Sequence, residues 1–369
     1  MKLKITVLFT GILVMIAGLT GCNSPGKAAV GIEDEILVFS DSLDYIAMEE
    51  TLNQVFGKVI YTPQPENLFN LEWRDITKIN HYKTRKNIII MAPLDSESNG
   101  SIYMRGLLDS TVTDMVKSGK EFVFTKFDEW AKNQLVMVLA ANTIDDLKEK
   151  VGSNQEDLVY YFQKVSDKRL AEKLYSHVYE RKEIQAQLLN DYGWMIYVQI
   201  DFHLAKNVPE DNFVWLRRAP GSDMERWIFV HWIDNATPEY LNRDSVIALR
   251  NRITQKYYRT SDDRNFVEIA QYDEYLKTSE VNFNNRYALM TEGLWRMDDK
   301  SMGGPFVNYT FFDEKTNRIY MLDGSLYAPK YYKKKLIQQV DVMLKSFQAS
   351  YEISDDRKEQ LLDELPDKD

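Results

Sequence analysis

The sequence has only one cysteine, four histidines and 16 glycines among its 369 residues. A single cysteine excludes a fold held together by disulfide bonds, and the low glycine count excludes a collagen-like chain. The chain also lacks a net positive charge, because 56 acidic residues outnumber 46 basic ones and give a formal charge of −10. Phosphate backbones are bound by an excess of positive charge, so we expect no nucleic-acid partner.

The residues that are present are typical of a globular protein. Hydrophobic residues make up 44% of the sequence and aromatic residues 12%, which is far too apolar for a disordered chain. At roughly 100–200 residues per domain, the length predicts two domains or one large domain with two lobes.

The first 22 residues resemble a bacterial lipoprotein signal. Lys2 and Lys4 precede an uncharged run of 15 residues at positions 5–19. That run is shorter than a membrane-spanning helix and is typical of a signal-peptide core. It ends in LTGC at 19–22, which resembles the lipobox, where diacylglycerol is joined to the cysteine thiol before cleavage on its N-terminal side. We therefore predict a signal peptide at 1–21 and lipidation of Cys22.

Cleavage before Cys22 would leave 348 residues with a net charge of −12. Acyl chains on the cysteine would then hold the protein on a membrane. In lipoproteins an aspartate after the cysteine favours the inner membrane, whereas Asn23 follows it here. We expect an outer-membrane lipoprotein that faces the periplasm, with residues 22–33 as a lipidated tether.

Alternating strand and helix patterns predict an α/β lobe over residues 34–190. Apolar runs at 36–40, 87–91, 121–125 and 134–140 predict strands. Helices are expected at 42–55, 104–116, 143–150 and 156–189.

Residues 191–348 predict an antiparallel lobe. A strand is expected at 194–201, followed by hairpins that pair 212–218 with 226–233 and 307–312 with 318–322, and by helices around 246–257 and 332–347. The predicted fold class is α+β, with two packed α/β lobes, the second an antiparallel sheet with hairpins covered by helices. This topology resembles Mog-like and photosystem-accessory sandwiches. Residues 349–369 predict an acidic mobile tail.

Several stretches resemble a family of Gram-negative envelope lipoproteins known as domain of unknown function 4837. They follow one another along nearly all of the mature chain: FGK at 56–58, PQPENLF at 63–69, RKNII at 85–89, FVWLR at 213–217, GLW at 293–295, MGGPF at 302–306, LDG at 322–324 and YAPK at 327–330. The resemblance implies a lipid-anchored envelope protein without an assigned activity, cofactor or catalytic residue.

The sequence contains no recognisable catalytic motif. His81, His177, His203 and His231 do not have metal-ligand spacing, and a lipidated Cys22 leaves no thiolate, so we expect neither a metal nor a cofactor. The glycine and serine motifs of hydrolases and NTPases are absent as well. Adjacent acids at 145–146 and 262–263 are typical of helix starts and turns. An envelope hydrolase with two carboxylates stays an alternative, although the sequence does not pair them.

Two stretches are candidates for a binding surface. In the hairpin at 212–233, tryptophans next to arginines could stack on a sugar or peptide if exposed, although alternate aromatics are also typical of packed sheet faces. The stretch 293–306 contains a Gly-Gly-Pro that predicts either a ligand-facing loop or a tight turn. The candidate surface comprises Trp215, Arg217, Arg218, Trp227, Trp295, Gly303, Gly304 and Pro305. We expect a non-catalytic binding or scaffolding lipoprotein that meets an envelope protein or a glycan.

Overall fold

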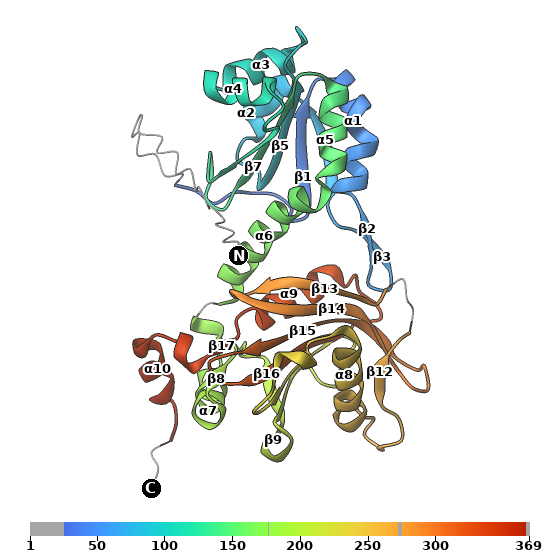
Figure 1. Ribbon diagram of the computed structural model, residues 1–369, viewed down its shortest axis with the longest axis vertical. Coiled ribbons are helices and arrows are strands. Elements are labelled where there is room, and N and C mark those ends of the chain that lie inside the picture. Colours follow the sequence, from blue (N-terminus) through green and yellow to red (C-terminus); the bar gives the residue numbers. More distant parts are fainter. Residues whose placement is uncertain (1–25, 176, 272–274, 367–369) are drawn as a thin grey trace, which may run out of the picture.

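The computed structural model describes residues 26–175, 177–271 and 275–366. The predicted signal peptide and Cys22 therefore lie outside the described residues. Two lobes are stacked along the long axis of the molecule and joined by one long helix (Figure 1). The predicted α+β class with two lobes is confirmed.

The first lobe is built on a five-stranded sheet with strand order β4-β1-β5-β7-β6. The first four strands in this order run parallel, and β6 runs antiparallel to β7. Every residue of β5 and β7 is buried, which explains their unbroken apolar sequences. The bounds are β1 (Glu35–Ser40), β4 (Asn70–Asp75), β5 (Asn87–Pro93), β6 (Val123–Phe127) and β7 (Leu135–Ala141). All four predicted strands are confirmed, whereas the half-exposed edge strand β4 was not predicted.

Helices cover both faces of this sheet. Ile36 and Val38 point into one hydrophobic cluster with α1, α5 and α6, while Leu37 and Phe39 point into another with α2, α3 and α4. The bounds are α1 (Ser42–Val55), α2 (Ile79–Tyr82), α3 (Asn99–Leu107), α4 (Ser110–Lys117), α5 (Ile144–Ser153) and α6 (Gln155–Leu174). The single helix predicted at 104–116 is wrong, because the chain breaks there and the Asp109 carboxylate caps α4 by accepting from the Val112 amide at 2.8 Å.

The second lobe contains an antiparallel sheet with strand order β12-β14-β15-β16-β11-β10-β9, and β13 also pairs with β14. Both predicted hairpins are confirmed, as β10–β11 and β15–β16. The bounds are β9 (Phe202–Val208), β10 (Phe213–Arg218), β11 (Glu225–Ile233), β12 (Val267–Ile269), β13 (Lys277–Phe283), β14 (Arg286–Met297), β15 (Gly303–Asp313) and β16 (Arg318–Tyr327).

Helices also cover both faces of the second sheet. Alternate residues of β11 separate the two cores: Ile228 and Val230 face α7 (Lys182–Tyr192) and α9 (Lys334–Leu344), while Trp227 and Phe229 face α8 (Arg243–Tyr257). The predicted strand at 194–201 is only β8 (Trp194–Met195), which pairs with β17 (Gln348–Ala349) instead of joining the main sheet.

The lobes meet near residue 175 rather than at the predicted boundary of 190. The expected helix over 156–189 is interrupted, since α6 ends at Leu174, η2 (His177–Tyr179) follows, and α7 packs in the second lobe. The C-terminal segment also differs from the predicted mobile tail. η5 (Ser350–Glu352) and α10 (Asp355–Leu362) pack against α7, because Ile353 and Leu361 supply an apolar face to an otherwise acidic segment.

A hairpin from the first lobe reaches the second (Figure 1). It consists of β2 (Val59–Tyr61) and β3 (Pro65–Asn67), and its Glu66 carboxylate accepts from the backbone amides of Lys333 and Lys334 at the start of α9. Lys334 also pairs with Asp34 at 3.0 Å. Within the described part of the chain, no helix combines the length and apolar character needed to cross a membrane.

Candidate functional site

The predicted tryptophan surface is not exposed. Trp215, Trp227 and Trp295 are 7%, 6% and 1% accessible and lie between the second sheet and the C-terminal end of α8. Tyr258 packs on Trp215 with ring centroids 4.5 Å apart, and Trp227 packs on Trp295 at 4.9 Å. These residues therefore form a core, because alternate positions of the strands face the helix.

The arginines of this candidate surface are half-buried and paired. Arg217 contacts the Trp215 ring and pairs with the Glu225 carboxylate at 2.6 Å, and Arg218 pairs with Asp201. Their charges are thus compensated within the second lobe and do not form a free anion site.

The Gly-Gly-Pro stretch is part of a strand and not a ligand-facing loop. Gly303, Gly304 and Pro305 begin β15, and the last two are buried. A Cβ atom on Gly304 would collide with the backbone carbonyl oxygen of Leu326 on the neighbouring strand. Glycine is required here because the two strands approach closely, and not because a loop needs conformational freedom.

The described histidines and carboxylates do not assemble a metal centre. No group of three or more His, Cys, Asp or Glu residues among those described is arranged to hold a metal ion. His231 is buried, and burial lowers its pKa to about 4 although its ring interacts with the Asn212 carbonyl oxygen at 3.0 Å. A neutral, packed imidazole is the result.

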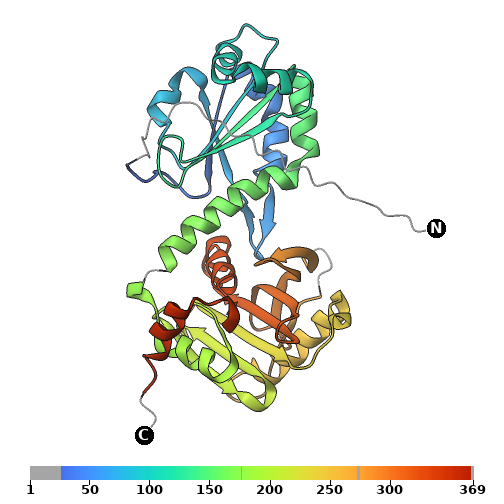
Figure 2. The same cartoon turned by 60° about the vertical axis from the view of Figure 1, so that its left-hand side comes forward.

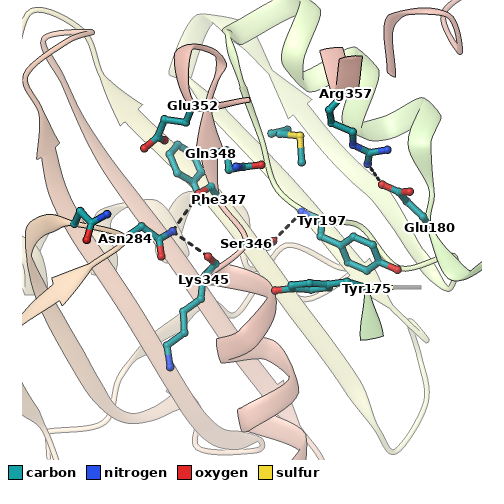
Figure 3. A pocket seen from close by; sticks show the side chains of 12 residues that line it. Tyr175, Glu180, Tyr197, Asn284, Lys345, Ser346, Phe347, Gln348, Glu352 and Arg357 are labelled. Atoms are coloured by element: carbon teal, nitrogen blue, oxygen red, sulfur yellow. Dashed lines mark hydrogen bonds and ion pairs between the residues drawn. The ribbon is translucent and has the colours of Figure 1, made fainter. Parts of the chain in front are cut away.

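A pocket in the second lobe has a volume of about 560 Å³. Such a volume falls within the range of about 300–1,000 Å³ that is usual for small-molecule sites. Five segments meet there: the link between α6 and α7, the chain around β8, the β13–β14 turn, the link from α9 to β17, and the η5–α10 segment (Figure 3). Its lining residues are Tyr175, Glu180, Met195, Tyr197, Asn284, Asn285, Lys345, Ser346, Phe347, Gln348, Glu352 and Arg357.

Two tyrosine rings form one wall of this pocket. Tyr175 and Tyr197 have ring centroids 4.6 Å apart, and Figure 3 shows the two rings next to each other. The Tyr197 hydroxyl donates to the Leu174 carbonyl oxygen at 2.6 Å, and the Tyr175 hydroxyl donates to the Val342 carbonyl oxygen. Burial raises the pKa of both tyrosines. The hydroxyls are therefore neutral and already hydrogen-bonded. Tyr197 is 6% accessible, so the half-buried ring of Tyr175 is the surface that this pair can offer to a ligand.

Ionised side chains at the pocket are paired with partners in the protein. Glu180 pairs with Arg357, and Glu352 pairs with Arg286. Lys345 extends away between two carboxylates, with Nζ at 2.7 Å from both Asp167 and Asp341.

The pKa of Lys345 is raised by this pairing. Burial alone would lower it, but the neighbouring Asp341 and Asp167 carboxylates raise it above its usual value. The lysine is therefore held as a cation within the protein. The pocket consequently presents compensated charge to a ligand.

Side-chain amides supply the remaining polar groups. Asn284 uses its amide nitrogen to donate to the carbonyl oxygens of Lys345 and Phe347, at 2.9 and 3.2 Å (Figure 3). The side-chain amides of Asn285 and Gln348 have no hydrogen-bond partner among the described residues, although the backbone N–H of Asn285 donates to Asn282. Both asparagines have positive φ, 50° and 65°, which suits the two central positions of a tight hairpin turn. The turn therefore projects two amides to the edge of the pocket.

A second polar group lies at the carboxyl ends of β1 and β5, where the strand order of the parallel sheet reverses. Asp41 accepts from the Gly100 amide at the start of α3. Burial raises the pKa of Asp44, and the charges of Asp41 and Asp95 add to this effect. Ligands often bind at this position in parallel sheets. Here the start of α3 is already satisfied by the protein's own carboxylate.

Sequence reasoning missed the pocket, whose residues come from segments far apart in the chain. The pair Asn284-Asn285 between two alternating segments was the one local signal available, since it predicts a hairpin turn. None of the candidate residues lines the pocket, and Cys22 lies outside the described residues.

Comparison with family models separates the two lobes. Residues 181–346 match the model of DUF4837, a domain of unknown function. The second lobe is therefore similar to the DUF4837 family. Residues 29–175 match a different model, DUF8532, which is also a domain of unknown function. The predicted match to DUF4837 is thus confirmed for the second lobe, whereas the envelope-lipoprotein part of that prediction stays a prediction. The stretches at 56–69 and 85–89 fall within the DUF8532 match.

Comparisons with curated proteins and with solved structures give no function for the second lobe. No curated protein matches the chain. Among solved structures, a mutant of the protein Mog1 is 12% identical, with a TM-score of 0.28 over 43% of this chain and 91% of that chain. The Ran-binding protein Mog1p of Saccharomyces cerevisiae is 12% identical, with a TM-score of 0.27 over 43% and 90% of the two chains. At these TM-scores the similarity carries no function over.

Proposed function

We propose that the protein is a lipid-anchored binding protein of the cell envelope and that the pocket in its second lobe holds a neutral, hydroxyl-rich ligand, such as a short segment of glycan. The supporting observation is the lining of the pocket, where charged groups are paired with one another while tyrosine rings and free amides face the cavity.

The chemistry of the lining favours hydroxyl groups over charged groups. A side-chain amide offers both donors and an acceptor, so it can bind a hydroxyl in either role. The half-buried Tyr175, whose ring packs on the buried Tyr197, offers a ring against which the apolar C–H face of a sugar can pack. A charged ligand would instead need a free counter-charge, and Glu180 and Arg357 already neutralise each other.

The anchoring part of the proposal rests on the sequence before the first lobe. A basic start, a short apolar run and Cys22 after a small residue match a lipoprotein signal. We propose that Cys22 carries acyl chains, that Asn23 directs the protein to the outer membrane, and that the two lobes face the periplasm.

Mass spectrometry of the mature N-terminus tests the anchor. The expected species begins at an acylated Cys22 and lacks residues 1–21. A Cys22→Ser variant is the control and is expected to remain unacylated and to leave the membrane fraction unless its signal segment is retained. A wild-type protein with an intact segment 1–21 would refute the anchor.

Calorimetric titration of the purified full-length mature protein with maltotriose, cellotriose and chitotriose tests the pocket. We expect one of these neutral trisaccharides to bind and Asn285→Gly with Gln348→Met to weaken it about tenfold, since each hydrogen bond is worth about 0.5–1.5 kcal/mol. Asn317→Gly and Gln54→Met are matched controls, because Asn317 also has positive φ and Gln54 is exposed on α1.

Three results would overturn this proposal. They are the absence of millimolar or tighter binding by all three sugars, an equal loss of binding in the pocket and control variants, and cleavage of the bound sugar. Cleavage, seen by chromatography of the titrated mixture, would favour the hydrolase alternative instead.

A further inference from the structure

The first described residues are fixed against the first lobe. Residues 27–32 run along the edge where β5 and β7 begin, and the Ala29 amide donates to the Lys132 carbonyl oxygen at 2.8 Å. Further along, the Val30 amide donates to the Thr84 carbonyl oxygen, and the Lys86 amide donates back to Val30, both at 3.0 Å. In Figure 1 this dark-blue segment lies on the side of the first lobe opposite α1 and α5, and Figure 2 agrees. The point at which the tether enters the fold is therefore rigid.

Three segments form one surface around this entry point, which we call the anchor face: residues 27–32, 83–86 and 126–132. Lys27 and Lys132 belong to neighbouring segments, since the Lys132 amide donates to the Lys27 carbonyl oxygen at 2.9 Å. The segments 83–86 and 126–132 are linked by Gln134, which follows the latter. Its side-chain amide donates to the carbonyl oxygens of Lys83 and Arg85, each at 2.6 Å.

Positive charge is concentrated on the anchor face. Lys86 on this face pairs with Glu33 and is left aside. The other exposed or half-buried ionic groups are five basic residues and two acidic ones. They are Lys27, Lys83, Arg85, Lys126 and Lys132, with Asp128 and Glu129. Lys126 pairs with Glu129 at 3.3 Å, whereas Lys27, Lys83 and Lys132 have no ionic partner among the described residues. A basic surface is notable in a chain whose formal charge is −10.

Large apolar side chains are exposed on the same face. Val30 is 54% accessible, Ile32 57% and Phe127 54%. Basic and apolar groups together are what proteins use to bind the interface of an anionic membrane.

We propose that the anchor face lies directly against the membrane surface and contacts anionic lipid headgroups. This inference rests on the proposed acylation of Cys22, because only four chain steps separate that residue from Gly26, the first described residue. Four residues span at most about 14 Å. Acyl chains in the bilayer would therefore hold Lys27 and its neighbours at headgroup level, and the second signal makes the attachment durable and oriented.

Lysine acetylation of the acylated full-length protein tests this orientation. The protein is reconstituted into vesicles of phosphatidylcholine with phosphatidylglycerol, into vesicles of phosphatidylcholine alone, and into detergent micelles. Lys27, Lys83 and Lys132 are expected to react at least fivefold more slowly in anionic vesicles than in micelles. The internal controls are three exposed lysines far from the anchor face: Lys117 at the end of α4, Lys120 just after it, and Lys148 on α5. They should react equally fast in anionic vesicles and in micelles.

A charge-reversal variant separates the face from the acyl chains. In Lys27→Glu/Lys83→Glu/Lys132→Glu, the remaining Lys126 should regain the reactivity that it has in micelles, although the protein still floats with the vesicles. In the matched control Lys117→Glu/Lys120→Glu/Lys148→Glu, Lys126 should stay protected.

Equal reaction of the two lysine sets in anionic vesicles would overturn the proposal while leaving the anchor intact. Absence of acyl chains in the mass spectrum of Cys22 would instead defeat the anchor and, with it, this orientation.

Discussion

Arg250 on α8 donates from Nε to Asp323 Oδ2 on β16 at 2.6 Å, and neither side chain reaches solvent. The pair is embedded in further polar contacts, because Arg250 also donates to Ser325 at 3.0 Å and Asn308 donates to Asp323 at 3.2 Å. The guanidinium carbon lies 3.7 Å from the centroid of the Phe306 ring. These contacts compensate part of the loss of hydration, while Arg250 Nη1 has no hydrogen-bond partner among the described residues. They also fix the position of α8 over the sheet.

Removing one partner of this pair should destabilise the second lobe strongly. Asp323→Asn leaves the Arg250 cation buried without a counter-charge, so we expect a loss of about 3–5 kcal/mol in the free energy of unfolding, measured by urea denaturation with tryptophan fluorescence. The double variant Arg250→Met/Asp323→Leu removes both charges and should recover most of that loss. A cost below about 1 kcal/mol for the single variant would contradict this account.

Gly304 should not tolerate even a methyl group. Its Cβ position lies 1.9 Å from the Leu326 carbonyl oxygen, so Gly304→Ala must push β15 away from β16. We expect a loss of about 3 kcal/mol or more in the free energy of unfolding, measured by thermal or urea denaturation. Gly106→Ala is the matched control, because Gly106 lies within α3 with open space around its Cβ position and should gain about 0.5–1 kcal/mol. Equal stability of the two variants would show that β15 has room to shift.

Burial of His231 should make stability depend on pH in the mildly acidic range. Burial holds its folded-state pKa at about 4, below the usual 6.5. Between these values the unfolded state takes up the proton first, so stability falls as the pH drops from about 6.5 toward 4, by up to about 3 kcal/mol.

Urea denaturation at pH 7, 6, 5 and 4 measures this effect. His231→Gln is expected to be somewhat less stable at pH 7 and to show a shallower decline below pH 6.5. The exposed His81→Gln should keep the wild-type slope. If the slopes of all three proteins coincide, His231 is not the group responsible.

The parts of the fold that the sequence predicted are those with strong local signals. Leu135–Ala141 is buried at every residue, so an unbroken apolar run could only be a central strand. The β10–β11 turn has Ala219 and Gly221 at positive φ, 50° and 78°, and its Pro-Gly-Ser-Asp sequence marks it clearly.

What was missed depends on tertiary contacts. No proline or glycine stands between Leu174 and Lys182, so nothing local signals that α6 ends, and the break is held by Tyr175, which donates to Val342 of α9. The Gly-Gly-Pro sequence indicated a backbone requirement at Gly304. The requirement is close approach to a neighbouring strand and not the conformational freedom of a loop. The pocket unites five separate segments, a proximity that no single stretch encodes.

Contact between the lobes should depend on Glu66 more than on any exposed surface charge. Its carboxylate accepts from the Lys333 amide at 2.8 Å and from the Lys334 amide at 3.1 Å, which satisfies free N–H groups at the start of α9. Glu66→Ala removes this contact across the lobes, and we expect a loss of about 1–2 kcal/mol.

Hydrogen exchange and calorimetry distinguish the loss of this contact from a general destabilisation of the fold. In Glu66→Ala, amides 333–337 should exchange faster and the unfolding endotherm should broaden or split. The reason is that the β2–β3 hairpin no longer caps the start of α9 and contacts it only through Gln64 and Asn67. Glu50→Ala, on the exposed face of α1, is the matched control and should change neither reading. If exchange at 333–337 matches the wild type, the cap on α9 is supplied by other groups. The coupling between the lobes must then rest on the pair of Lys334 with Asp34 and on the contacts of α6 with Gln338 and Lys345.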